Sequence, residues 1–335
     1  MLGNGVTFAV VAGISVAPVL RMNSTSFRHC LVVAGLLTGS SLFAAGKIER
    51  VVEKTFSANG AGLLRVETSG GGVRVAQGSG TEVKVVARQK IRADSEAEAD
   101  ELLKKLTLTM EQSGNDVALA SKYESRPAGF RFGSWPPVQV EFTVTVPATF
   151  SVDLRTSGGG IVVGDLKGTA DVRTSGGGIV LGRIGGTVKA RTSGGGITLA
   201  EAGADVDLDT SGGGIAVGRV AGAARLGTSG GSIKIESVEN ALQAHTSGGG
   251  IHARIAGPLR AECSLSTSGG SVQVEVDKVA AFQLDASTSG GHVDANGLTM
   301  TVKKSDRSRL AGDVNGGGPL LKLRSSGGGI GIRVR

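Results

Sequence analysis

Apolar and polar residues alternate strictly through most of the chain after residue 150. The pair Ile197 and Leu199 occupies every second position, and the pair Val206 and Leu208 repeats the pattern nine residues later. Alternation with a period of two predicts β-strands that bury one face. Corresponding pairs recur in the neighbouring segments, so the pattern predicts a long series of short strands.

The word Thr-Ser-Gly-Gly divides this series into segments of fixed length. Its successive occurrences are 18 residues apart five times and then 21 residues apart twice. A constant period of this size indicates that each segment is one structural unit stacked on the next. The word begins at Thr68, Thr156, Thr174, Thr192, Thr210, Thr228, Thr246, Thr267 and Thr288, and a variant begins at Ser325.

Each segment has the features of one coil of a solenoid, with two strands and a further inward apolar position such as Ile184 or Ala202. Stacking in register would place parallel strands about 4.8 Å apart. Parallel connections within one sheet are right-handed in nearly all cases. The sequence therefore predicts an all-β fold, a right-handed single-stranded parallel β-helix (β-solenoid) with 18–21 residues per coil. Ala170 in one coil corresponds to Val188 in the next, and this size matching suits a narrow interior.

The repeated word predicts the structure of the corner between strands. We expect its glycines to adopt positive φ and to let the backbones of adjacent coils approach closely. Thr156 and its equivalents alternate in phase with the inward positions, which predicts a stacked threonine column with hydroxyls bonded along the stack. An ice-binding face would need a second threonine column, and the alternate position holds Arg155, Arg173 and Arg191 instead.

The gap of 88 residues after Thr68 indicates an insertion into the series of coils. It contains strand-like residues 83–91 and 138–146, and between them a helical stretch at residues 95–105 that Asp94 or Ser95 would cap. We expect a helix-bearing insertion that covers the first open end of the solenoid.

The C-terminal part of the chain departs from the regular spacing as well. The gap of 37 residues before Ser325 predicts one degenerate coil between Leu298 and Leu323, with alternating apolar residues from Leu298 to Val302. The chain then ends in a strand with Ile330 and Ile332 inward and with no long cap. This pattern predicts an open C-terminal coil through which copies of the chain could associate.

Residues 1–45 have the features of an export signal. From Met22, a polar stretch with Arg28 precedes an apolar run at residues 31–37 and a small-residue segment that ends at Ala45. We interpret Met22 as the true start, residues 46–150 as the N-terminal coil with its capping insertion, and residues 151–335 as the repeat domain. The alternative for residues 6–20 is a membrane anchor, although a spanning helix needs about 20 residues.

Composition narrows the class of protein further. The chain has 56 glycines and 3% aromatic residues, which disfavours an aromatic-rich globular core, and it lacks the strict glycine period of collagen. The net charge of +7 comes from basic and acidic residues that are interleaved, so no basic stripe for a nucleic acid is predicted. Of the two cysteines, Cys30 would leave with the signal and Cys263 would be an unpaired core residue.

Three features in this order carry a family resemblance. They are the serial Ser-Gly-Gly corners, the segment Val146-Pro147-Ala148 leading into Val152, and the acidic helix at residues 94–105. Over residues 47–335 the chain resembles the "putative adhesin" domain of unknown function, a β-helical repeat family of bacterial envelope proteins. The resemblance implies an exported, non-enzymatic surface or periplasmic module, and the family offers no catalytic residues to carry over.

The outward positions of one predicted strand form two charged columns. Asp153 and Asp171 lie in one column, and Arg155, Arg173 and Arg191 lie in the other. Neighbouring opposite charges predict a mutually neutralising ladder, in which each exposed pair contributes about 0–1 kcal/mol. The functional alternative is a site for an anionic glycan on the arginine column.

A loop at residues 126–137 gathers the aromatic residues Phe130, Phe132 and Trp135 with arginines. Such rings can bind a partner or stack on sugars, but they can also fold down and plug the first coil, which is the interpretation that we favour. His245 and His252 lack the spacing of a metal site, so no metal or cofactor is predicted.

Together these observations predict a non-enzymatic, exported adhesin-like envelope protein. It would be periplasmic, outer-membrane-associated or on the cell surface, and it would present a repetitive surface to a cell-surface glycan or an envelope protein. One alternative is a carbohydrate-active enzyme, a polysaccharide lyase or hydrolase, with Asp153 and Asp171 as candidate groups. Another alternative is a self-assembling structural protein or one associated with envelope stress.

Overall fold

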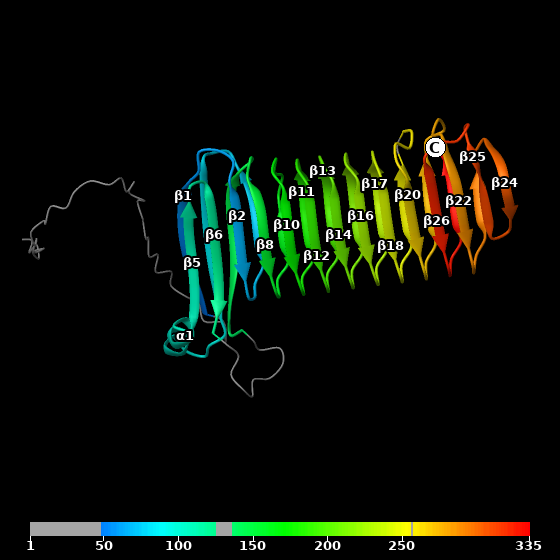
Figure 1. The fold of residues 1–335 in the computed structure, drawn as a ribbon. Coiled ribbons are helices and arrows are strands. Elements are labelled where there is room, and N and C mark those ends of the chain that lie inside the picture. The colour runs from blue at the N-terminus through cyan, green and yellow to red at the C-terminus, as the bar shows by residue number, and fades with distance from the viewer. Residues whose placement is uncertain (1–47, 125–135, 256) are drawn as a thin grey trace, which may run out of the picture. The chain divides into compact units, whose positions relative to one another are not determined.

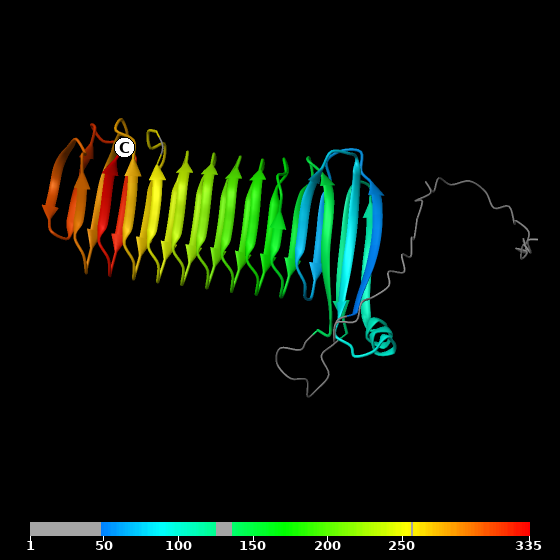
Figure 2. The ribbon, with the colours of Figure 1, turned by 180° about the vertical axis from the view of Figure 1, so that it is seen from behind.

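The computed structural model describes residues 48–124, 136–255 and 257–335. Within these ranges the strands pair into two long, largely parallel sheets, as expected for an all-β solenoid, and the only helix is short (Figures 1 and 2). The sheet with 13 strands is named A, and the sheet with 14 strands is named B. The described part of the chain contains no helix with the length and apolar character needed to cross a membrane. The predicted export signal lies outside the described residues.

The two sheets are given in their spatial order, so that neighbours in each series are hydrogen-bonded. Sheet A consists of β1 (Ile48–Ser57), β4 (Glu82–Ile91), β7 (Val138–Pro147), β3 (Val73–Gly78), β9 (Ile161–Val163), β11 (Ile179–Ile184), β13 (Ile197–Ala202), β15 (Ile215–Val220), β17 (Ile233–Val238), β19 (Ile251–Ile255), β21 (Val272–Val276), β27 (Ile330–Val334) and β23 (Val293–Asn296). Sheet B consists of β5 (Leu106–Ser113), β6 (Asp116–Tyr123), β2 (Leu63–Thr68), β8 (Ser151–Thr156), β10 (Ala170–Thr174), β12 (Val188–Thr192), β14 (Val206–Thr210), β16 (Ala224–Thr228), β18 (Leu242–Thr246), β20 (Cys263–Thr267), β26 (Leu320–Ser325), β22 (Phe282–Thr288), β25 (Arg309–Val314) and β24 (Met300–Asp306).

The strand register confirms the coil of 18 residues. Ile179 pairs with Ile197 in sheet A, and Val188 pairs with Val206 in sheet B, so both sheets advance by one period. These four side chains are at most 3% exposed, and the further inward position Ile184 is 1% exposed. Each regular coil therefore gives one strand to each sheet and encloses an apolar interior between them.

Residue sizes are matched between the neighbouring strands β10 and β12, as the sequence predicts. Ala170 pairs with Val188, and Val172 pairs with Ala190 in the same two strands. All four side chains are buried. Between these two strands a large residue lies against a small one at both positions, which suits a narrow interior.

The threonine column closes the corner between the sheets, but in the regular coils its hydroxyls donate to glycine carbonyls and not to one another. Thr192 is 5% exposed and donates from Oγ1 to the carbonyl oxygen of Gly177 in the preceding coil, at 2.7 Å. These bonds satisfy buried hydroxyls and tie one coil to the next. The expected hydroxyl-to-hydroxyl bonding is therefore wrong for these coils, because the acceptor is a glycine carbonyl of the neighbouring coil. Equivalent bonds of 2.6–2.8 Å are donated by Thr156, Thr174, Thr210, Thr228, Thr246, Thr267, Thr288 and Ser325.

The second glycine of each regular corner is required by the close approach of neighbouring coils. A β-carbon on Gly195 would lie 2.3 Å from the carbonyl oxygen of Gly177 and 2.4 Å from the nitrogen of Gly178. The expectation of positive φ is wrong for these glycines, because among the described corners only Gly71 lies in the left-handed region, at 97°. Space, and not backbone conformation, therefore excludes a side chain here.

The strands between the first two corners extend both sheets beyond the first coil. Strands β4 and β7 and helix α1 (Glu96–Leu103) lie at the expected positions, and Ser95 caps the helix by accepting a hydrogen bond from the Glu98 amide. Strand β6, which was not predicted, pairs in parallel with β2. At the edge strands, Lys54 on β1 donates from Nζ to the carbonyl oxygen of Met110 on β5 at 2.7 Å. This bond bridges the two sheets where the solenoid begins.

The C-terminal coil does not lie at the end of the solenoid. Strand β26 lies between β20 and β22, and β27 lies between β21 and β23, so the last strands of the chain are inserted between two earlier coils (Figure 1). Ile330 and Ile332 point inward as predicted, at 1% exposed. The expected open C-terminal coil is nevertheless wrong, and self-association through it would find no free strand edge.

The segment predicted as a degenerate coil between Leu298 and Leu323 is an antiparallel hairpin. Strand β24 pairs with β25, and β25 pairs with β22, so the hairpin extends sheet B. Val302 is 52% exposed instead of inward. Asn315, Gly316 and Gly317, with φ of 47°, 91° and 87°, then turn the chain back towards β26. These left-handed conformations, which glycine adopts readily, allow the return that a regular coil would not make.

Candidate functional site

The predicted arginine column lies on the outward face of sheet B. Arg155 on β8 pairs in register with Arg173 on β10, and Arg173 pairs with Arg191 on β12. Their side chains are 47%, 44% and 54% exposed. In-register parallel strands place these residues about 4.8 Å apart, so the three guanidinium groups form a row across the strands.

Each arginine of the column has a carboxylate partner. The predicted neutralising ladder is present in the structure, and Arg191 finds its partner in the aspartate row of the next coil. The hydrogen bond to Asp153 raises the pKa of Arg155, and this guanidinium stays positively charged. The ion pairs are Arg155–Asp153 at 3.1 Å, Arg173–Asp171 at 3.4 Å and Arg191–Asp207 at 3.0 Å.

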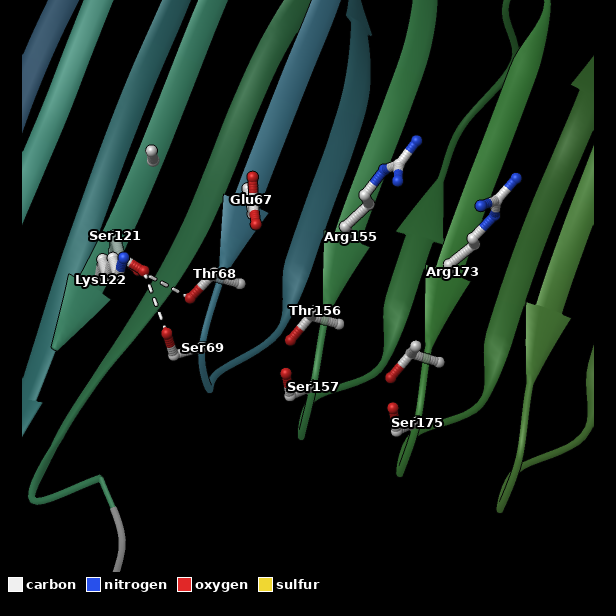
Figure 3. Close-up of a pocket in the computed structure, with 12 residues that line it drawn as sticks. Glu67, Thr68, Ser69, Ser121, Lys122, Arg155, Thr156, Ser157, Arg173 and Ser175 are labelled. Atoms are coloured by element: carbon white, nitrogen blue, oxygen red, sulfur yellow. Dashed lines mark hydrogen bonds between the residues drawn. The ribbon is translucent and has the colours of Figure 1, made fainter. Parts of the chain in front are cut away.

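A groove of about 450 Å³ lies beside the first two arginines, where β6, β2, β8 and β10 reach the corner (Figure 3). In Figure 3 the guanidinium groups of Arg155 and Arg173 extend in the same direction along their strands, and Ser157 and Ser175 lie at the corner below them. Charged donors and hydroxyls thus line one open surface. The exposed polar residues that line the groove are Glu67, Ser69, Lys122, Arg155, Ser157, Arg173 and Ser175.

Two kinds of hydroxyl meet at this corner, and they have different roles. Thr68 is 3% exposed, and its Oγ1 lies 2.8 Å from Ser121 Oγ and donates to the carbonyl oxygen of Gly70 at 2.8 Å. This bond holds the inserted strand β6 against β2. Ser157 and Ser175 are exposed, so their hydroxyls are accessible to a ligand.

The arrangement suits recognition of an anionic, hydroxyl-rich ligand. Guanidinium groups bind carboxylates through two parallel N–H···O bonds, and hydroxyls both donate and accept hydrogen bonds. The enzyme candidates Asp153 and Asp171 are in-register neighbours, and each is ion-paired with an arginine. Among the described residues, no group of three or more histidine, cysteine or acidic side chains could hold a metal ion.

The other predicted site residues are not brought to this groove. Phe130, Phe132 and Trp135 lie outside the described residues. His245 on β18 and His252 on β19 are exposed and belong to different sheets. The two histidines therefore do not combine into one site.

Sequence reasoning missed the wall of the groove that β6 contributes. Ser121 and Lys122 lie next to Thr68 and Ser69, although more than 50 residues separate them along the chain. The alternation of Val117, Leu119 and Ser121 was the available signal for this strand. No sequence signal indicated which coil it would join.

No protein of curated function matches the chain. Among solved structures, it is similar to a "putative cell adhesion protein" from Clostridium sporogenes (12% identity, TM-score 0.22, covering 86% of this chain and 100% of that one). It is also similar to a "putative adhesin" from Bacteroides fragilis (11% identity, TM-score 0.28, covering 85% of this chain and 97% of that one). A third similar structure is a "putative lipid binding protein" from Parabacteroides distasonis (13% identity, TM-score 0.38, covering 84% of this chain and 96% of that one). The family model of the Toastrack domain, DUF4097, matches residues 64–333, and the chain therefore belongs to the Toastrack DUF4097 family.

Proposed function

We propose that this chain is an exported, non-enzymatic envelope protein of the adhesin type that binds an acidic glycan on sheet B. The observation that carries the proposal is the in-register row of Arg155, Arg173 and Arg191 beside a hydroxyl-lined groove. The signal-like residues 1–45 support export. Right-handed winding of a single chain, inferred from the rule for parallel connections, would present this row on a rigid face.

The ion pairs of the column favour exchange with a ligand. An exposed arginine–carboxylate pair contributes only about 0–1 kcal/mol, so a carboxylate of the glycan can replace the aspartate partner at little cost. Arg155 and Arg173 keep nearly half of their side-chain surface exposed despite their ion pairs. A polymer that contacts several coils at once gains affinity because each further contact forms within the same complex.

Titration of the full-length protein with hexagalacturonate, an acidic hexasaccharide, tests the proposal. Replacing Arg155 and Arg173 by alanine together should weaken binding at least tenfold, since two charge-assisted hydrogen-bonding groups are lost. The matched control replaces Arg183 and Arg219, two exposed ion-paired arginines of sheet A, and removes the same charge. This control should leave the dissociation constant within twofold of the wild type.

Two results would overturn the proposed function. Equal weakening by both double variants would show that only net charge matters, and the groove would have no special role. Cleavage of the hexasaccharide that is abolished by Asp153→Ala would show an enzyme instead of a binding protein. Binding should also weaken as salt is raised, because exposed charges are screened.

A further inference from the structure

The arginine row continues into a second, different surface on sheet B. The same outward column passes from Arg191 to Asp209 on β14, then to Gly227 on β16 and to His245 on β18. Gly227 has no side chain, so the column has a notch between Asp209 and His245. A groove of about 450 Å³ opens around this notch, and we call it the Gly227 groove.

Three charged groups of the Gly227 groove differ from the arginine row in their pairing, while a fourth, Asp207, is the partner of Arg191. Asp209, Arg225 and Glu262 line the groove and are exposed, and within the described chain none of them forms an ion pair. All three arginines of the row have carboxylate partners. Unpaired donors and acceptors of both signs therefore meet in the Gly227 groove.

Two side chains at the groove have defined positions. His245 Nδ1 lies 2.9 Å from Ser266 Oγ, and this hydrogen bond orients the ring and leaves Nε2 for another partner. A β-carbon on Gly227 would lie 2.8 Å from Asp209 Oδ2, so the carboxylate already leans over the notch. The inserted C-terminal coil adds Lys322, whose strand pairs with that of Ser264.

We propose that the Gly227 groove is a second saccharide subsite, one that takes an uncharged, hydroxyl-rich sugar unit. Asp209 and Glu262 would accept hydrogen bonds from sugar hydroxyls, and Arg225 would donate to hydroxyl or ring oxygens. Arg225 and Lys322 offset the two carboxylates, so the groove has no excess of positive charge that would select an acidic sugar. The proposal deepens the proposed function, on which it rests for the class of ligand.

The position of the groove supports a shared ligand. Three strand steps separate Arg173 on β10 from Gly227 on β16, which is about 14 Å at the spacing of parallel strands. Both sites lie on one column of the same sheet face. A single linear glycan with acidic and neutral units could therefore occupy both.

The test measures binding of uncharged hexasaccharides, namely maltohexaose, cellohexaose and mannohexaose, to the full-length protein by calorimetry and saturation-transfer NMR. Gly227→Arg fills the notch, and its β-carbon meets only the flexible Asp209 side chain. Asp209→Asn removes the charge and keeps the shape. Ala216→Arg, at an exposed position of sheet A, is the control for added charge.

We expect at least one uncharged hexasaccharide to bind, with a loss of at least tenfold in Gly227→Arg and in Asp209→Asn and no change in Ala216→Arg. Absence of binding by all three sugars at millimolar concentration, or equal binding by Gly227→Arg and the wild type, would overturn the proposal. The variant that lacks Arg155 and Arg173 separates the two sites. It should keep its affinity for the uncharged sugar even if hexagalacturonate does not bind at all.

Discussion

The second glycine of the corner should tolerate no side chain, and Gly195→Ala tests this. The new β-carbon would lie 2.3 Å from the carbonyl oxygen of Gly177, whereas ordinary contacts begin near 3.4 Å. The neighbouring atoms are backbone, so no rotamer change can relieve the overlap. The two coils must move apart by about 1 Å, which is the shortfall in this contact.

This movement would weaken the hydrogen bonds that join the coils at the same corner. Thr192 donates to the Gly177 carbonyl at 2.7 Å, and the Gly194 amide donates to the Ser175 carbonyl at 3.0 Å. Loss of two such bonds costs about 2 kcal/mol, and overpacking costs about 1–3 kcal/mol more. We therefore expect Gly195→Ala to lower the free energy of unfolding by about 3–5 kcal/mol.

The next glycine of the same corner is the matched control. A β-carbon on Gly196 would lie 3.0 Å from the Gly214 carbonyl oxygen, and the equivalent position holds Ser232 and Ser271 in other coils. Gly196→Ala should change stability by less than about 1 kcal/mol, because tight contact and the reduced entropy of the unfolded chain act in opposite directions. Denaturant-induced unfolding followed by circular dichroism measures both variants. Equal midpoints for the two would refute the argument from close approach.

Three further changes test the interior and the corner. Ile197→Asp should lower the unfolding free energy by several kcal/mol, because it places a charge at a position that is 1% exposed. Thr198→Asp, at the next and outward position, should have little effect. Similar denaturation midpoints for the two variants would contradict the inward assignment of Ile197. Thr192→Val should cost about 1–2 kcal/mol by leaving the Gly177 carbonyl without its donor, and unchanged urea unfolding would argue against that bond. Burial raises the pKa of the Cys263 thiol, so the folded state holds this proton more tightly than the unfolded state, and stability should fall as pH rises above about 8.5. The melting temperature measured from pH 7 to pH 10 should decline more steeply in the wild type than in Cys263→Ala, and parallel profiles would contradict this linkage.

The regular coils could be predicted because their residues act through local, repeated constraints. The alternation at Ile197 and Leu199 fixes which side chains face inward, and a shift by one residue would expose all of them. The 18-residue spacing of Thr174 and Thr192 then fixes the register between neighbouring coils. Both facts are visible in a single segment and its neighbour, and the structure confirms them.

The order of the last coils could not be predicted for a related reason. The corners at Thr267, Thr288 and Ser325 present the same donor to a neighbouring coil, and Ser325 bonds to Gly270 as a threonine of the next coil in sequence would. The alternating pattern therefore specifies how a coil stacks but not which coil lies beside it. Interchangeable corners let the C-terminal coil take a place between two earlier ones.

Some residues of the candidate site were predictable from the repeat, and others reach it from segments that are distant in the sequence. The row of Arg155, Arg173 and Arg191 follows from the coil spacing, and its position on one sheet face was predictable. Ser121 and Lys122 reach the groove through an inserted strand, and Lys322 reaches the second groove through the displaced C-terminal coil. Neither contact has a signature in the repeat.

Two glycines show how the demands of the fold can be separated from those of a surface. At Gly195 an added β-carbon would meet the backbone of the neighbouring coil, so the fold itself requires glycine there. At Gly227 it would meet only the end of the Asp209 side chain, which can move aside. The fold thus gives no reason for a missing side chain at Gly227, whose neighbours in the column, Asp209 and His245, carry polar groups. A binding surface gives one, because the notch exposes Asp209 and His245 to the same ligand.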